Sequence, residues 1–181
     1  MTEKFSHAEA KLAGAALDTL KVMDTVLEAP REIKETLTKA SPSALYAYAT
    51  DPGYKPDDNL LRLLATDEDA RTGFQRLLEN TSVYVLPQMA AASTGDIETR
   101  EVEGCKIVFR PSRANPDQLY AIIEIANVET APSMLFMRQP NGETNRITLP
   151  GFQDGRAQLL LERNSADARG LMDINTEVYL R

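Results

Sequence analysis

The sequence predicts an α+β protein in which a bundle of about five helices is followed by an antiparallel β-sandwich or open barrel of about seven strands. Two observations support this fold class. Apolar residues recur at helical spacing in residues 1–92, whereas apolar and polar residues alternate after Asp96. We therefore expect a helical domain over residues 1–92 and an antiparallel β domain over residues 97–181, with one core shared between them or a separate core in each.

The longest predicted helix covers residues 5–28, which contain no proline and a single glycine. Its apolar positions have the spacing that places them on one face of a helix. This face includes Leu12, Ala16, Leu20, Met23 and Leu27. Pro30 then opens a second, shorter helix that ends near Lys39.

The third helix is predicted to begin at Ser41-Pro42, because serine caps a helix N-terminus and proline is favoured in the first turn. Asp51-Pro52-Gly53 ends this helix in a turn. At helical spacing, three residues of the segment would face the core: Leu45, Tyr48 and Ala49.

Two more helices are predicted before Ser82. Pro56 restarts the helical pattern, and a group of leucines gives it an apolar face: Leu60, Leu61, Leu63 and Leu64. Thr66 and Asp69 form a variant of the capping box, which indicates that Thr66 caps the fifth helix. This helix is predicted to end at Asn80, a residue tolerated at a helix C-terminus.

Residues 83–92 have no single pattern. Val83 to Leu86 are typical of a strand, whereas residues 88–92 favour a helix. Pro87 argues against either element running through the segment. We interpret it as a connector that packs against another element, and we predict the domain boundary at residues 93–96.

The second half of the chain has strand and turn signals. Cys105, Ile107 and Phe109 lie on one side of a predicted strand, and residues 119–125 are apolar on both faces, as expected for a central strand. Asn141-Gly142 predicts a hairpin turn. The other predicted elements are strands at 134–138, 146–149, 157–161 and 176–180, a turn at Asp154-Gly155, and a single helical turn capped by Ser165 and extending through Leu171.

Composition limits the classes of function. The 181 residues include 20 Lys and Arg against 27 Asp and Glu, so the net charge is −7. Phosphate groups repel an acidic chain without a basic block, and we therefore expect neither nucleic acid nor a membrane as partner. One Cys and one His exclude a disulfide framework and argue against a zinc site. The N-terminus has no apolar signal segment, so the expected location is the cytoplasm.

The sequence offers no clear catalytic residue, no set of metal ligands and no cofactor motif. His7 lies in the first turns of a helix, and we interpret it as a surface residue. Cys105 is in phase with the apolar side of its strand, so its thiol is expected to be buried and unreactive. Glu124 lies in the most apolar strand, but no second acid is spaced to act with it as an acid–base pair.

Arginines of the second half are candidates for binding an anion: Arg110, Arg113, Arg138 and Arg146. Arg110 and Arg113 are the stronger pair, since they lie at the end of a strand, where loop residues often carry function. The alternative is that these arginines face solvent or pair with the excess of acidic side chains.

Residues 60–71, together with the helix that follows them to Leu78, resemble the short helical segments of anti-sigma factors. Those domains are acidic, helical proteins that hold a transcription factor, so the resemblance implies a binding role. This chain departs from the zinc-bearing members, because it lacks the His and Cys ligands that they need.

These observations favour a non-enzymatic interaction or regulatory module that binds another protein, or a second copy of itself, without a cofactor. The apolar face of residues 5–28 and the edge of the β-sheet are the candidate contact surfaces. The alternative is a small-ligand carrier or a carboxylate-based enzyme with a pocket inside the β domain, where Glu124 and Tyr120 would be the polar groups. A purely structural subunit is a third possibility.

Overall fold

A computed structural model of the chain describes residues 41–89 and 97–181. The described residues belong to a compact unit that spans Ala40–Arg181. The two helices predicted before Ser41 and the domain boundary predicted at residues 93–96 lie outside the described residues.

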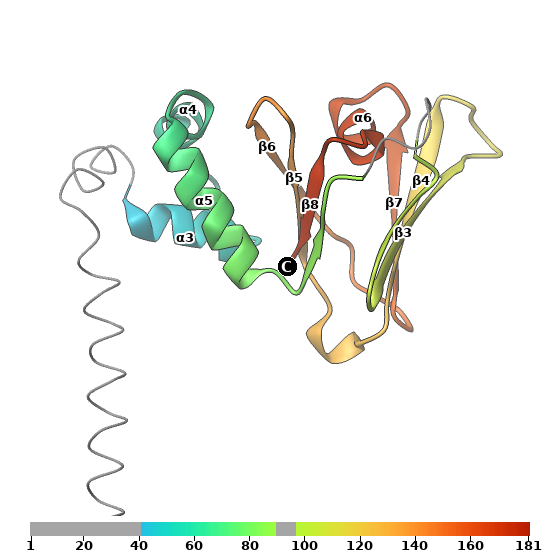
Figure 1. The fold of residues 1–181 in the computed structure, drawn as a ribbon. Helices are drawn as coiled ribbons and strands as arrows, with labels where there is room; N and C mark the ends of the chain where they lie inside the picture. The colour runs from blue at the N-terminus through green and yellow to red at the C-terminus, as the bar shows by residue number, and fades with distance from the viewer. Residues whose placement is uncertain (1–40, 90–96) are drawn as a thin grey trace, which may run out of the picture. The chain divides into compact units, whose positions relative to one another are not determined.

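The described residues form helices first and antiparallel strands afterwards, which confirms the α+β class (Figure 1). The elements are α3 (Pro42–Thr50), α4 (Asp58–Thr66), α5 (Glu68–Thr81), β1 (Tyr84–Leu86), β2 (Thr99–Val102), β3 (Cys105–Pro111), β4 (Gln118–Ile125), η2 (Val128–Thr130), β5 (Met134–Arg138), β6 (Thr144–Thr148), β7 (Arg156–Glu162), α6 (Ala166–Met172) and β8 (Glu177–Leu180). The strand Thr99–Val102 is absent from the sequence prediction.

The strands form two four-stranded sheets, and neighbouring strands within each sheet are antiparallel. Sheet A has the order β1-β8-β5-β6, and sheet B has the order β2-β3-β4-β7. The sheets remain separate and pack face to face, so the architecture is a sandwich and not a closed barrel (Figure 1). Residues 119–125 lie in β4, between β3 and β7, as predicted for a central strand.

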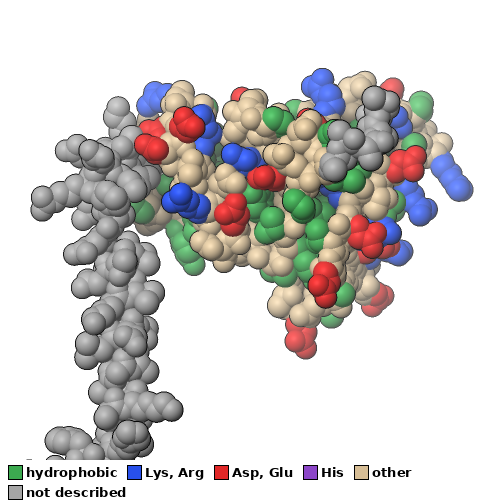
Figure 2. Space-filling view, in the orientation of Figure 1, with side chains coloured by type: hydrophobic (Ala, Val, Ile, Leu, Met, Phe, Trp, Pro, Cys, Tyr) green, Lys and Arg blue, Asp and Glu red, His purple; other side chains and the backbone are tan. Residues whose placement is uncertain are grey.

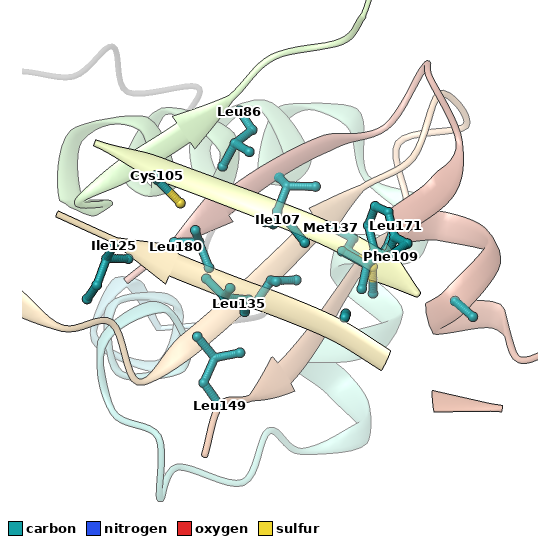
Figure 3. Packing of buried hydrophobic residues seen from close by; sticks show 14 of the residues in the cluster. Leu86, Cys105, Ile107, Phe109, Ile125, Leu135, Met137, Leu149, Leu171 and Leu180 are labelled. Carbon is teal, nitrogen blue, oxygen red and sulfur yellow. The ribbon is translucent and has the colours of Figure 1, made fainter. Parts of the chain in front are cut away.

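The main core lies between the two sheets (Figure 3). Sheet B contributes Cys105, Ile107 and Phe109, which are buried while the residues between them are partly exposed, so the predicted alternation is confirmed. Sheet A contributes Leu135 and Met137 to the same cluster. These side chains meet because strand residues two apart point to the same face of a sheet.

The helices cover the other face of sheet A. Tyr48 of α3 stacks on Phe74 of α5, with 5.5 Å between ring centroids, and both rings meet Phe136 of β5 edge-on at 5.9 Å. The described residues therefore form three layers, which are the helices, sheet A and sheet B (Figure 1). Sheet A is covered on both faces, and Met134 to Met137 of β5 are all buried as a result.

The third helix follows the prediction closely. It begins after Ser41, whose hydroxyl accepts a hydrogen bond from the amide of Ser43, and it ends before Asp51. Its buried residues are the three predicted, Leu45, Tyr48 and Ala49.

The next two helices differ from the prediction in detail. Leu61 of the predicted apolar face is 44% exposed, and the fifth helix is capped by Asp67 instead of Thr66. Thr66 is the last residue of α4, where its hydroxyl donates to the carbonyl oxygen of Arg62 at 2.8 Å. Asp67 accepts from the amide of Ala70 at 2.9 Å, so one residue ends α4 and starts α5.

The predicted hairpin and the last short helix are also present. Asn141-Gly142 joins β5 to β6, with Gly142 at a φ of 85°, which glycine adopts without strain. The second strand begins at Thr144, two residues before the predicted start. Ser165 caps α6 by accepting from the amide of Ala168 at 3.1 Å.

Candidate functional site

The predicted contact residues lie in different parts of the chain. Arg110 is exposed at the end of β3, and Arg113 is exposed in the loop between β3 and β4. Between them, the buried Ser112 hydroxyl accepts from the amides of Ala114 and Asn115, which shapes the loop. The five residues of the predicted N-terminal contact face, Leu12, Ala16, Leu20, Met23 and Leu27, lie outside the described residues.

Arg138 and Arg146 are in sheet A and do not join Arg110 and Arg113, which are in and beside sheet B. Arg138 pairs with Glu177 at 3.3 Å. The guanidinium of Arg146 donates to backbone oxygens in the last turn of α3 and in the turn that follows it. The four arginines therefore do not converge on one anion site.

Tyr120 and Glu124 lie on the outer face of sheet B and not between the sheets. In β4 their neighbours Leu119, Ala121 and Ile123 are buried, while Tyr120 and Glu124 are partly exposed. The carboxylate of Glu124 pairs with the guanidinium of Arg156 at 2.5 Å. Neither residue is thus available to line the interior of the sandwich.

The outer face of sheet B has an apolar centre. Val108 is paired in register with Ile122, and Tyr120 is paired with Leu160. Val108, Ile122 and Tyr120 are half-buried, and Leu160 is 51% exposed. In contrast to sheet A, no described helix packs on this face.

Polar pairs border this apolar centre at both ends of the strands. At one end, Glu101, Lys106, Glu124 and Arg156 stand in one row across the four strands. Lys106 bonds Glu101 at 3.0 Å, and Arg156 bonds Glu124. At the other end, the side chain of Gln118 donates to that of Glu162 at 3.0 Å. An apolar centre with a polar rim is the usual anatomy of a protein contact surface.

The edge of β7 that faces away from β4 carries no described strand. The amide of Ile125 donates to the carbonyl oxygen of Gly155. In an antiparallel pair the residues that bond to the neighbouring strand alternate, so Gly155 and every second residue after it bond to β4. The residues between them direct their N–H and C=O groups to the free edge. Two of these residues already have partners. Gln153 exchanges backbone hydrogen bonds with Arg156, and the amide of Ser165 donates to the carbonyl oxygen of Glu162. Within the described residues, Gln158 and Leu160 are left with unpaired N–H and C=O groups on this edge.

A hollow of about 720 Å³ lies where β7 begins. Its lining includes Glu124 and Arg156 from the charged row, and Pro150, Gly151 and Gln153 from the loop before β7. The hollow is thus polar on one side and borders the free edge of β7 at Gln158.

The two residues considered as nucleophile or base give no site in the described structure. Cys105 is 3% exposed, and burial raises the pKa of its thiol from 9.0 to about 12. His7 lies outside the described residues. Within residues 41–89 and 97–181, no three His, Cys, Asp or Glu side chains are grouped so that they could hold a metal ion.

On the face that Figure 2 shows, Asp and Glu side chains are interspersed with Lys and Arg and do not gather by sign. None of the helices in the described parts of the chain is long and apolar enough to cross a membrane.

Comparison of the chain with models of protein families, with curated proteins and with solved structures finds no match. No family model therefore supports the resemblance of residues 60–78 to anti-sigma factors. Within residues 41–89 and 97–181, the candidate site is a β-sheet face without a covering helix, beside a strand edge without a paired strand.

Proposed function

We propose that this protein is a non-enzymatic binding module whose partner is a protein that adds an extended strand to the free edge of β7. The unpaired backbone groups of Gln158 and Leu160 carry the proposal, because such groups are the template on which a second chain pairs. β7 contains neither proline nor lysine, which natural edge strands use against pairing, and its two charged residues, Arg156 and Glu162, stand at its ends.

The side chains around this edge favour a partner strand with apolar residues on both of its faces. On the outer face, the added strand would lie beside Leu160, whose side chain is 51% exposed. On the core side it would cover Leu159 and Leu161, which are half-buried at the margin of the core. Gln153 is paired with Arg156 at this edge, so the hydrogen bonds of the added strand would begin at Gln158.

The experiment uses the full chain and its Leu160→Pro variant. A protein retained from a cell lysate by the wild-type chain is purified and titrated against both. Proline removes the outward N–H of Leu160, which does not bond to β4, so the fold is kept while an added strand loses a hydrogen bond. We expect the affinity to fall roughly tenfold or more. Hydrogen exchange of the Gln158 and Leu160 amides should slow when the partner is bound.

A matched pair of charge variants separates this edge from the edge of the other sheet. Leu160→Lys places a charge on β7, and Val85→Lys places the same charge on β1, an edge strand of sheet A, where Val85 is 38% exposed. The proposal requires that only Leu160→Lys weakens binding. A partner that binds the Leu160→Pro chain normally, but is lost from a Leu20→Glu chain, would assign the contact to residues 5–28 instead.

The small-ligand alternative has one supporting observation, which is the hollow at the start of β7. Glu124, the acid considered from the sequence, lines this hollow. A ligand held there would raise the melting temperature, and the rise would grow with the logarithm of the ligand concentration once that exceeds the Kd. A thermal-shift screen of metabolites on the wild-type and Glu124→Gln chains tests this candidate, which needs a shift that the variant loses.

A further inference from the structure

A second hollow lies at the opposite end of sheet B from the charged row, where β3 ends and β7 has passed into the turn before α6. Its volume is about 200 Å³. Most of its lining is apolar: Ile97, Phe109, Pro111, Leu119 and Met172. The polar lining residues are Arg110, Arg163 and Glu98. The hollow therefore combines an apolar wall with two guanidinium groups.

The two arginines have no acidic partner within the described residues. No Asp or Glu carboxylate in that part of the chain lies at ion-pair distance from either guanidinium. The Nε atom of Arg163 is buried and makes no hydrogen bond there. A guanidinium without a carboxylate partner leaves its outward N–H groups available to an acceptor that enters the hollow.

The charge and size of the hollow define the acceptor. A carboxylate takes parallel hydrogen bonds from a guanidinium, whereas the nearby Glu98 disfavours a doubly charged phosphate. At about 30 Å³ for each water-sized group, the volume holds roughly seven heavy atoms. The apolar wall requires that most of these atoms are carbon.

We propose that this hollow binds a monocarboxylate with a short apolar tail, whose carboxylate is held by Arg163 and Arg110 and whose tail packs against Phe109, Leu119 and Met172. The ligand is a small free acid or the C-terminal residue of a polypeptide, since both present this chemistry. This site is separate from the β7 edge, and it is independent of the binding function proposed for that edge.

The test is a titration of the full-length protein with pentanoate, which has five carbons and two oxygens, followed by nuclear magnetic resonance. We expect saturable shifts of the amide signals of Leu119 and Met172 with an affinity in the millimolar range. Arg163→Gln should weaken binding about tenfold or more, because a charge-assisted hydrogen bond is lost. Arg169→Gln is the matched control, since Arg169 is exposed on α6 and does not line the hollow.

Two further variants keep the result decisive. Arg110→Gln changes an exposed residue and should also weaken binding, even where Arg163→Gln disturbs the fold. Glu98→Gln should tighten binding, because it removes a negative charge beside the carboxylate. The proposal is overturned when pentan-1-ol binds as tightly as pentanoate, or when both arginine variants bind pentanoate like the wild type.

Two acetylated tripeptides that end in valine, one with a free carboxylate and one with an amide, distinguish the sources of the ligand. Tighter binding of the peptide acid than of pentanoate supports the site and assigns it to a polypeptide C-terminus. Tighter binding of pentanoate supports the site and assigns it to a small acid. Equal binding of the peptide acid and its amide, without binding of pentanoate, contradicts the carboxylate proposal.

Discussion

The guanidinium of Arg146, on β6, lies over the aromatic ring of Tyr48, on α3, with 4.6 Å between its central carbon and the ring centroid. The same group donates to the backbone oxygens of Tyr48 at 3.2 Å and of Tyr54 at 2.6 Å. The carbonyl of Tyr48 has no intrahelical donor, because the residue four positions later is Pro52. Arg146 therefore caps α3 and joins the helices to sheet A by a cation–π contact and hydrogen bonds.

Replacing Arg146 by methionine should lower the free energy of unfolding by about 2 kcal/mol, because carbonyl oxygens at the end of α3 lose their donor. Hydrogen exchange should quicken in α3 and stay unchanged in β3 and β4. Arg62→Met is the matched control, since Arg62 is exposed on α4 and contacts only Asn59 by a side-chain hydrogen bond. Equal urea midpoints for the two variants would contradict this role of Arg146.

Arg100 has a similar role at the end of α6, but its side chain is buried. Its side chain is 1% exposed and donates to the carbonyl oxygens of Leu171 at 2.7 Å, Thr176 at 2.9 Å and Asp173. Burial lowers the pKa of the guanidinium, and the charge of Asp173 opposes that effect. These carbonyls belong to the end of α6 and the turn before β8, so Arg100 fixes this turn to β2.

The Arg100→Lys variant keeps the charge and loses the planar fork of donors, so part of the carbonyl set stays unpaired in a buried site. We expect a loss of about 3 kcal/mol in the free energy of unfolding, measured with urea. Arg110→Lys makes the same change at an exposed arginine of β3 and should alter stability by less than about 0.5 kcal/mol. A loss of similar size in both variants would show that Arg100 is not a special case.

The contrast between Arg100 and Tyr48 illustrates what the sequence could predict. The helix that contains Tyr48 has its capping residue, its stop signal and its apolar spacing within residues 41–53, so its bounds and buried face follow from local pattern. Local pattern places arginine at the surface. The burial of Arg100 depends on carbonyls more than 70 residues away, and no signal near Arg100 indicates them.

The candidate site divides in the same way. The apolar run of residues 119–125 correctly predicts a central strand, but it cannot say that Glu124 and Tyr120 are on the outer face, because both faces are apolar in the sequence. The free edge of β7 depends on sheet order, which the sequence does not contain. Gln158 and Leu160 become candidates only when β4 is known to occupy the other side of β7.

Native Cys105 should resist thiol reagents at neutral pH. Its side chain is 3% exposed, and burial raises the pKa of its thiol to about 12, so both access and ionisation are suppressed. We expect no maleimide labelling of the folded chain within the time that labels the urea-unfolded chain completely. Mass spectrometry of the intact protein measures the difference, and rapid labelling of the folded chain would assign a reactive thiol.

The same burial makes stability depend on alkaline pH. Because the folded pKa of Cys105 is raised from 9.0 to about 12, its thiol stabilises the folded state below pH 9, and this contribution is lost as pH rises toward 12. Burial and its bond to Glu177 raise the pKa of Tyr179 too, with the same sign. Above pH 9, the free energy of unfolding measured with urea should fall less steeply with pH in the Cys105→Ala variant than in the wild type. The difference between the two slopes should correspond to about one proton. An unchanged slope would contradict the shifted thiol.

Gly155 is the position where the hairpin before β7 depends most on glycine. Its φ is 75°, and a Cβ added there would lie 2.7 Å from the carbonyl oxygen of Ile125. Gly155→Ala should therefore lower the free energy of unfolding by about 2 kcal/mol or more, through backbone strain and the displacement of β4. At Gly151, in the same loop, an added Cβ meets nothing within 4 Å, so Gly151→Ala should change stability by less than about 0.5 kcal/mol. Urea unfolding of both variants measures the difference, and equal midpoints would show that the turn tolerates a side chain at Gly155.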